Sequence, residues 1–257
     1  DAAAALAAGN PIIAKGNTGH PGTTKLLTEA AFDAVQATDV PKAMVQLIYR
    51  TGHETGEKLV SHPLAGATGF TGSRKAGLAL KAAADEAGKP IYLEMSAVNP
   101  VFVLPGALEE RLEAVADELF ASCSLGVGQF CTKPGLTILL ASDRSDAFLD
   151  AVAERFRTPP GVLLGEGGVW TISEAVETLC ESGAELVVGG EPVEGAGYRY
   201  ANTLLRVDGD RFLAHPHALQ TEAFGVVSLL VFAKDVEQMM LIARRLEGSL
   251  TDRKSVV

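Results

Sequence analysis

The chain has 257 residues, of which 47% are hydrophobic and 21% charged, and it contains 27 glycines, 12 prolines and 3 cysteines. This composition excludes collagen-like, disulfide-framework and intrinsically disordered proteins, and the length allows one large domain or two modest ones. Because there are 22 basic and 32 acidic residues, the formal net charge is −10, which disfavours nucleic acid as a partner.

The sequence carries no sign of a membrane span or a secretory leader. Its longest nearly apolar run, residues 226–233, is too short to cross the hydrocarbon core of a bilayer. The first residues include neither an initiating methionine nor a cationic start, so we expect a chain that is truncated at its beginning. Three cysteines without a CxxC pair favour free thiols in a reducing compartment, which predicts a soluble, cytoplasmic protein.

The first 95 residues alternate between short apolar runs and segments with helical spacing, in which Leu26 and Leu27 belong to the first stripe. The pattern predicts strands at 11–14, 44–49, 67–71 and 91–93 and helices at 23–37, 56–60 and 75–87. Ser73 can cap the third helix. Such alternation predicts parallel strands joined by helical crossovers, hence an α/β sheet covered on both faces with ligands at its strand ends.

From Pro105 the sequence changes to a longer amphipathic helix. Its apolar stripe consists of Leu108, Leu112, Val115, Ala116, Leu119 and Phe120. We expect helices at 105–125, 145–156, 173–182 and 236–246 and strands at 136–141, 185–188, 198–207 and 225–232. A domain boundary near residues 95–105 then gives one domain at 1–95 and a second at 96–257.

The absence of several well-known short motifs argues against the corresponding classes of protein. The sequence contains no G-x-G-x-x-G, P-loop, G-x-S-x-G or H-E-x-x-H motif, which disfavours the usual dinucleotide-binding, NTPase, serine-hydrolase and zinc-protease families. Among the five histidines only His215 and His217 are close in sequence, and no cysteine cluster accompanies them. We therefore expect no metal site.

Two residues, Cys131 and Glu94, are candidates for a catalytic role. Cys131 lies in a glycine-punctuated loop, where backbone can approach a ligand, whereas Cys123 and Cys180 lie on predicted helices and are interpreted as small buried residues. Glu94 follows an apolar strand and would stand at its carboxyl end. The alternatives are that Glu94 is an ordinary solvated carboxylate and that Cys131 is an unreactive thiol. The reactivity of either group depends on its surroundings in the folded protein, which the sequence spacing does not show.

Four segments resemble the aldehyde dehydrogenase family when they are taken together. They occur in the order Phe70-Thr-Gly-Ser73, Leu93-Glu94-Met-Ser96 with Asn99-Pro100, Gly128-Gln-Phe-Cys131 and Thr221-Glu222-Ala-Phe224-Gly225. The resemblance covers nearly the whole chain. It implies a partial Rossmann-like, parallel-sheet cofactor domain followed by an α/β catalytic domain, in a chain that is short at both ends.

The resemblance also implies roles for the matching residues. Cys131 stands at the position of the family's nucleophile and Glu94 at that of its general base. The cofactor-binding positions of the family are matched by Lys15 for the adenosine ribose, Gly52 and Gly56 for a glycine-rich turn, Gly72 and Ser73 for the pyrophosphate, and Glu222 and Phe224 for the nicotinamide ribose. An asparagine that helps to bind the oxyanion in the family would lie upstream of Lys15, outside this chain.

The cofactor and substrate follow from the same resemblance. Many NAD-using members place a glutamate three residues after the lysine, but Thr18 stands here, so we expect NADP to be accepted or preferred, with NAD possible. Residues 94–107 and 15–22 are most similar to the α-ketoglutaric semialdehyde dehydrogenase branch, which oxidises 2,5-dioxopentanoate to 2-oxoglutarate. Family members form dimers or tetramers, which implies a homo-oligomer in the full-length form.

Some features depart from the family, and two alternatives stay open. Val226 replaces a proline that is common after the Phe-Gly pair, and residues 251–257 do not resemble the family's continuation. The first alternative is a truncated, non-catalytic nucleotide-binding fragment of such an enzyme. The second is a thiol hydrolase that cleaves activated esters through Cys131 without a cofactor.

Overall fold

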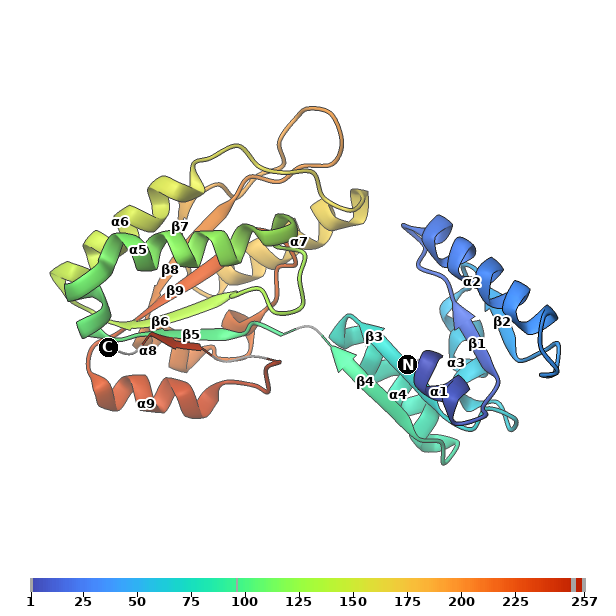
Figure 1. The fold of residues 1–257 in the computed structure, drawn as a ribbon. Coiled ribbons are helices and arrows are strands. Elements are labelled where there is room, and N and C mark those ends of the chain that lie inside the picture. Colours follow the sequence, from blue (N-terminus) through green and yellow to red (C-terminus); the bar gives the residue numbers. More distant parts are fainter. Residues whose placement is uncertain (1, 96, 251–252, 256–257) are drawn as a thin grey trace. The chain divides into compact units, whose positions relative to one another are not determined.

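A computed structural model of the chain describes residues 2–95, 97–250 and 253–255 (Figure 1). The chain divides into two compact units, Asp1–Met95 and Ser96–Val257, and each is considered by itself. No helix in the described ranges is long and apolar enough to span a membrane.

The first unit is built from parallel strand–helix–strand pairs. Its elements are α1 (Ala2–Ala7), β1 (Ile12–Lys15), α2 (Pro21–Gln36), β2 (Val45–Ile48), α3 (His53–Ser61), β3 (Thr68–Gly72), α4 (Arg74–Glu86) and β4 (Ile91–Met95). Within residues 2–95, β1 pairs with β2 and β3 with β4, and the two pairs are separate two-stranded sheets. The expected single sheet is therefore not formed in this unit, because each pair is closed by its own crossover helix and the local pattern does not specify how the pairs join.

Helix α4 packs closely on its own strand pair. Ser73 is its N-cap, and the Ser73 hydroxyl accepts a hydrogen bond from the Ala76 amide at 3.4 Å, which confirms the predicted cap. A β-carbon on Gly77 would lie only 2.7 Å from the Met95 sulfur, so this glycine lets the helix approach β4. The sequence pattern did not single out Gly77.

Much of the apolar surface of the first unit is exposed. Leu26 and Leu27 on α2 are each 68% exposed, whereas the buried residues of that helix are Thr28 and Val35. The predicted stripe on this helix therefore does not face the core of the unit. A two-stranded sheet is too narrow to cover the whole apolar width of a four-turn helix.

The second unit is a six-stranded sheet with helices on both faces. Its helices and strands are β5 (Pro100–Val103), α5 (Pro105–Ser124), β6 (Leu136–Leu140), α6 (Asp143–Phe156), α7 (Glu166–Glu181), β7 (Glu185–Val188), β8 (Thr203–Asp208), α8 (Gly209–Ala214), β9 (Val227–Ala233), α9 (Val236–Arg245) and β10 (Arg253–Ser255). The strand order is β10-β5-β6-β9-β8-β7, and only the β7–β8 pair is antiparallel.

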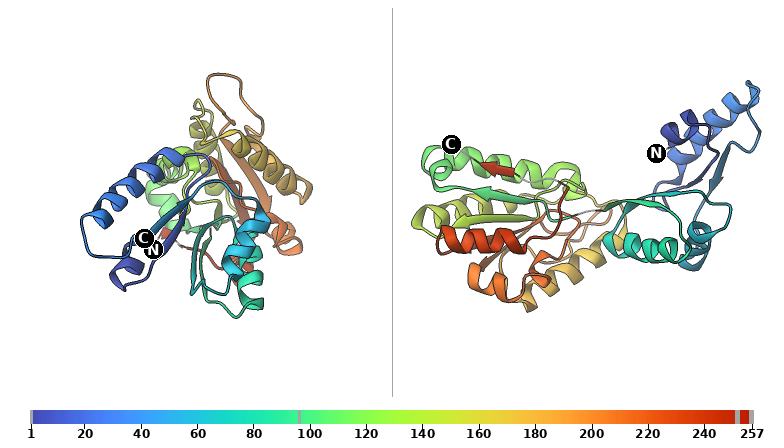
Figure 2. Two further views of the ribbon diagram at one scale, coloured as in Figure 1. Left: turned by 90° about the vertical axis from the view of Figure 1, so that its right-hand side faces the viewer. Right: turned by 90° about the horizontal axis from the view of Figure 1, so that it is seen from below.

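Helices cover both faces of this sheet (Figures 1 and 2), and alternate residues of the central strands supply an apolar layer on each face. One layer lies between the sheet and α5 and α6, and includes Leu139 and Leu230. The other lies between the sheet and α7, α8 and α9, and includes Ile138 and Leu229. Strands β6 and β9 are buried on both faces, as expected for central parallel strands.

Several boundaries in the second unit differ from the sequence-based expectation. The short elements β5, α8 and β10 are not predicted by the sequence pattern. Helix α7 begins at Glu166 rather than at 173, since its first turn contains Gly167 and Gly168, which resemble a loop. Strand β8 begins at Thr203 rather than at 198.

Candidate functional site

The candidate site of the second unit lies at the amino edge of the sheet. Strands β5, β6 and β9 are parallel neighbours, so the segments that enter them reach the same edge. These segments are residues 97–99, 126–135 and 221–226. Three of the motifs that carried the family resemblance are thus adjacent in space although they are far apart in sequence.

Cys131 lies in the segment that enters β6. Before it, Gly126, Val127 and Gly128 all have left-handed backbone, with φ of 57°, 59° and 67°. For the β-branched Val127 this conformation is unusual and carries strain. Cys131 is a free cysteine, and the residue is partly exposed.

The loop of Cys131 touches the Glu222–Phe224 segment through two glycines. A β-carbon on Gly128 would lie 2.3 Å from both the carbonyl carbon and the oxygen of Gly225. Backbone cannot move aside as a flexible side chain can. The two motifs therefore meet backbone to backbone, and only glycine fits at position 128.

Replacing Gly128 with alanine is expected to destabilise the second unit by about 3 kcal/mol, the sum of left-handed strain and overpacking. Thermal or urea unfolding measures the effect. Gly195 is a control for the close contact in the same unit, because its φ of 145° also strains an alanine but the nearest atoms to an added β-carbon belong to Arg199, 3.7 Å away. Equal losses in Gly128→Ala and Gly195→Ala would contradict the close contact with Gly225.

Asn99 joins the loop of Cys131 to the segment that enters β5. Its side chain is buried, and its amide nitrogen donates to the carbonyls of Ala97 at 3.0 Å, Cys131 at 2.8 Å and Lys133 at 3.1 Å. Asn99 itself has a left-handed φ of 48°, which asparagine tolerates better than most residues. The Asn99-Pro100 motif thus holds the backbone on both sides of Thr132.

Lys133 joins the same loop to the segment that enters β9. It is only 3% exposed, and its ammonium donates to the carbonyls of Ala223 at 3.2 Å and Val227 at 2.7 Å. Burial lowers the pKa of the Lys133 ammonium, while the nearby Cys123 and Glu222 act in the opposite direction. Sequence analysis missed this residue, because a lysine in a Gly/Pro-rich loop gives no signal that it is buried.

The other two cysteines differ from Cys131. Cys123 is fully buried on α5, and its thiol donates to the Pro134 carbonyl at 3.2 Å. Burial raises the pKa of Cys123 to about 11. Desolvation also raises the pKa of the partly buried Cys180. The interpretation as a buried residue is confirmed for Cys123, whereas Cys180, interpreted in the same way, is only partly buried. A raised thiol pKa makes both residues poor nucleophiles.

The candidate residues of the first unit gather at the carboxyl ends of its strands. Glu94 is paired with Thr71 and Met95 with Gly72, so Glu94 lies beside the turn that leads through Ser73 into α4. Glu94 is within β4 rather than after it, because pairing with β3 extends the strand to Met95. Its side chain is exposed.

The start of α4 suits an anionic group. A helix N-terminus offers free backbone N–H groups and a positive dipole end. Helix α4 has no acidic residue in its first turn, which begins with Arg74 and Lys75 after Ser73. By contrast α3, which begins after Gly52, has Glu54 in its first turn. A dinucleotide pyrophosphate therefore fits α4 better than α3.

The remaining candidate residues of the first unit are exposed or have few neighbouring atoms. Lys15 ends β1 and is exposed, with its ammonium 3.4 Å from the Gly16 carbonyl, and Thr18 is exposed in the loop before α2. An added β-carbon would meet nothing within 4 Å at Gly52, and only Leu80 at 4.0 Å at Gly56. Packing inside the unit does not require either glycine.

The structure thus forms two groups of candidate residues. In the first unit Glu94 lies beside Gly72, while in the second the loop of Cys131 meets the Glu222–Phe224 segment. Lys133 and Gly77 are structural partners that the sequence patterns did not identify, whereas Asn99 belongs to a quoted motif and gains its structural role here.

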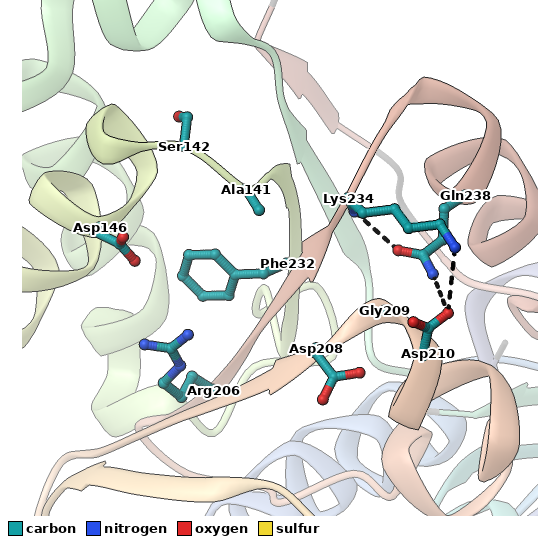
Figure 3. A pocket seen from close by; sticks show the side chains of 10 residues that line it. All are labelled: Ala141, Ser142, Asp146, Arg206, Asp208, Gly209, Asp210, Phe232, Lys234 and Gln238. Carbon is teal, nitrogen blue, oxygen red and sulfur yellow. Dashed lines mark hydrogen bonds and ion pairs between the residues drawn. The ribbon is translucent and has the colours of Figure 1, made fainter.

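A pocket lies at the opposite, carboxyl edge of the second sheet (Figure 3). Its polar side chains are largely paired with one another: Gln238 donates to Asp210 at 2.6 Å, Lys234 lies 3.7 Å from the same carboxylate, and the Arg206 guanidinium lies 4.7 Å from the centre of the Phe232 ring. This edge is the usual ligand side of a parallel sheet, yet Cys131 is at the other edge.

The fold and the order of these motifs identify the family of the chain. The family model "Aldehyde dehydrogenase family" matches residues 1–252, and the chain belongs to this family. Relatives include the α-ketoglutaric semialdehyde dehydrogenase 2 of Azospirillum brasilense, 37% identical, and the α-ketoglutaric semialdehyde dehydrogenase of Acinetobacter baylyi, 36% identical; each alignment covers 98% of this chain and 48% of the relative. The chain therefore spans about half the length of these relatives.

Solved structures support the fold. An indole-3-acetaldehyde dehydrogenase in complex with NAD+ superposes with a TM-score of 0.75 at 22% identity, covering 97% of this chain and 56% of that one. The expected α/β architecture and the family resemblance are confirmed.

Proposed function

We propose that the complete protein oxidises an aldehyde to a carboxylate with NAD(P), using Cys131 as nucleophile and Glu94 as general base. The observation that carries this proposal is the contact between the loop of Cys131 and the Glu222–Phe224 segment at the amino edge of the second sheet. A partly exposed thiol lies there, on a loop held by buried hydrogen bonds.

The thiolate of Cys131 adds to the aldehyde carbonyl and forms a tetrahedral thiohemiacetal. The backbone N–H of Cys131 stabilises the oxyanion. When bound, the nicotinamide ring supplies the hydride acceptor, and a thioester then remains on Cys131. Glu94 removes a proton from water, the resulting hydroxide attacks the thioester, and the carboxylic acid leaves as the thiolate is restored.

The cofactor is proposed to lie across the strand ends of the first unit. Gly72, Ser73 and the start of α4 would hold the pyrophosphate, with Gly52 and Gly56 keeping the neighbouring surface open. Lys15 and Thr18 would face the adenosine ribose, while Glu222 and Phe224 orient the nicotinamide ribose. The absence of acidic residues from the first turn of α4 supports this assignment.

We propose 2,5-dioxopentanoate as the substrate, because two of the relatives are named α-ketoglutaric semialdehyde dehydrogenases. A cytoplasmic homo-oligomer is proposed for the full-length form. NADPH formation from a panel of aldehydes, measured by near-ultraviolet absorbance, tests the function. Absence of turnover with every aldehyde by the gene's complete product would contradict it.

Replacing Thr18 with glutamate is expected to shift the preference from NADP towards NAD. A carboxylate would accept a hydrogen bond from a ribose 2′-hydroxyl and repel a 2′-phosphate, so KM for NADP should rise about tenfold or more. Thr38→Glu introduces the same charge on an exposed threonine at the other end of α2 and is the control. Parallel changes in both KM values for Thr18→Glu would place Thr18 away from the ribose.

A non-catalytic fragment is a second candidate for the chain as it stands. Apolar side chains such as Leu26, Leu27 and Leu64 are 68%, 68% and 89% exposed, which is expected of a unit that lacks neighbouring elements. Cofactor binding without turnover by the 257-residue chain, together with turnover by the complete gene product, would establish this alternative.

A further inference from the structure

Lys133 is the most deeply buried cation among the described residues of the second unit, and its position is specific. Lysine is almost never fully buried unless it is paired. Here the ammonium spans two carbonyls, those of Ala223 and Val227, which lie on either side of the Phe224-Gly225 turn. These bonds join residues 90 and 94 positions apart in sequence.

The two bonds lie where the backbone ladder ends. The β6–β9 pairing begins at Leu136 and Leu229, and the Leu229 amide still donates to the Gly135 carbonyl at 3.0 Å. On the N-terminal side of this pair, the two hydrogen bonds of the Lys133 side chain replace the main-chain hydrogen bonds between the strands. It therefore fixes the distance between the two loops in the region where main-chain pairing no longer does so.

The local charges agree with this arrangement. Burial disfavours the ammonium, but the Glu222 carboxylate and the two carbonyl oxygens favour it. A methionine side chain, which is of similar length, has no hydrogen-bond donor for either carbonyl. The Lys133 ammonium is thus hydrogen-bonded to, and electrostatically favoured by, the segment that contains Glu222 and Phe224.

We propose that Lys133 is a positioning residue, which holds the Glu222–Phe224 segment at a fixed distance from Cys131 through this pair of buried hydrogen bonds. The catalytic consequence rests on the proposed function, because that segment is assigned there to the nicotinamide ribose. Lys133 acts through the two loops and does not touch the reacting atoms.

The main test compares two reactions of Cys131 in the complete gene product. In Lys133→Met, aldehyde oxidation should fall about 100-fold and KM for NADP should rise, because a displacement of about 1 Å between reacting groups costs that much. Cofactor-free hydrolysis of p-nitrophenyl acetate should stay near the wild-type rate, because it needs the thiol but not the ribose contact. Lys133→Arg, which keeps the cation, should recover part of the oxidation.

Lys234→Met is the matched control, since Lys234 is exposed at the opposite edge of the same sheet. If oxidation and ester hydrolysis fall together in Lys133→Met, or if neither falls, the positioning role is overturned. A general loss of fold would also lower both activities, and thermal unfolding identifies it.

Two readouts do not depend on the dehydrogenase activity. In the wild-type chain Lys133 should resist acetylation by acetic anhydride while Lys234 is modified, and in Lys133→Met the amides of Gly225 and Val227 should lose protection from hydrogen exchange while those of α6 keep it. Ready acetylation of Lys133, or unchanged hydrogen-exchange protection of Gly225 and Val227 in Lys133→Met, would show that the Lys133 side chain does not link the two loops. A wild-type protein that has the bridge but oxidises no aldehyde would instead refute the proposed function.

Discussion

Aldehyde oxidation by the complete gene product is expected to fall by at least about 1,000-fold when Cys131 is replaced with alanine, because this change removes the proposed covalent nucleophile and with it the intermediate on which turnover would depend. A free aldehyde that has not formed the thiohemiacetal is a poor hydride donor. Cys131→Ser should be nearly as inactive, since a serine hydroxyl is a weaker nucleophile and a worse leaving group at neutral pH. Steady-state NADPH formation measures both variants.

Cys180→Ala is the matched control for this experiment. Cys180 is a partly exposed thiol on α7 whose raised pKa makes it a poor nucleophile, so its removal should leave the rate unchanged. Iodoacetamide labelling followed by peptide mass spectrometry adds a second measurement. Cys131 should be alkylated before Cys123, which is fully buried with a pKa of about 11. A full rate in Cys131→Ala would place the reaction elsewhere.

Helical periodicity predicted the positions of the helices more accurately than it predicted which face of each helix is buried. On α5 the predicted stripe from Leu108 to Leu119 is buried against the six-stranded sheet, and Phe120 packs edge to face on Phe156 with ring centres 5.3 Å apart. On α2 the equivalent stripe is exposed, because only a two-stranded pair lies beneath it. The same local pattern therefore has two outcomes, and the difference lies in tertiary neighbours that the pattern does not contain.

The candidate site was predictable in its residue types but not in its internal contacts. The motifs around Cys131 and Glu222 are adjacent because β6 and β9 are neighbours, although α6, α7, β7, β8 and α8 lie between them in sequence. The hydrogen bonds of Asn99 and Lys133 depend on this non-sequential order. Neither residue type signals burial, so these contacts were not predictable from a local pattern, although Asn99 stands in one of the motifs that carry the resemblance.

The two units present their candidate residues at different strand ends. Glu94 and Gly72 lie near the carboxyl ends of β4 and β3, in agreement with the general rule for parallel sheets. Cys131 precedes β6 and is at the amino end. The rule therefore points to the carboxyl-edge pocket of the second unit, whereas the resemblance of short motifs points to Cys131.

Replacing Glu94 with glutamine is expected to slow steady-state turnover by about 100- to 10,000-fold, the usual contribution of a general base. The amide cannot remove a proton from the hydrolytic water, whereas thiol addition and hydride transfer do not need that step. The thioester on Cys131 should therefore accumulate. Stopped-flow absorbance should show a rapid burst of one NADPH per active site followed by a slow phase, and mass spectrometry should detect the acyl adduct on the Cys131 peptide.

Glu86→Gln makes the same change on an exposed glutamate at the end of α4 and should leave both phases unchanged. The burst separates two possible roles of Glu94. If Glu94→Gln keeps the burst and loses the slow phase, the carboxylate acts on water after the thioester has formed. Loss of the burst itself would show that Glu94 acts earlier, by deprotonating Cys131, and an unchanged steady-state rate would remove it from the mechanism. Because thioester hydrolysis and thiol deprotonation require different positions of the carboxylate, the outcome also indicates which of the two Glu94 occupies in the complete protein.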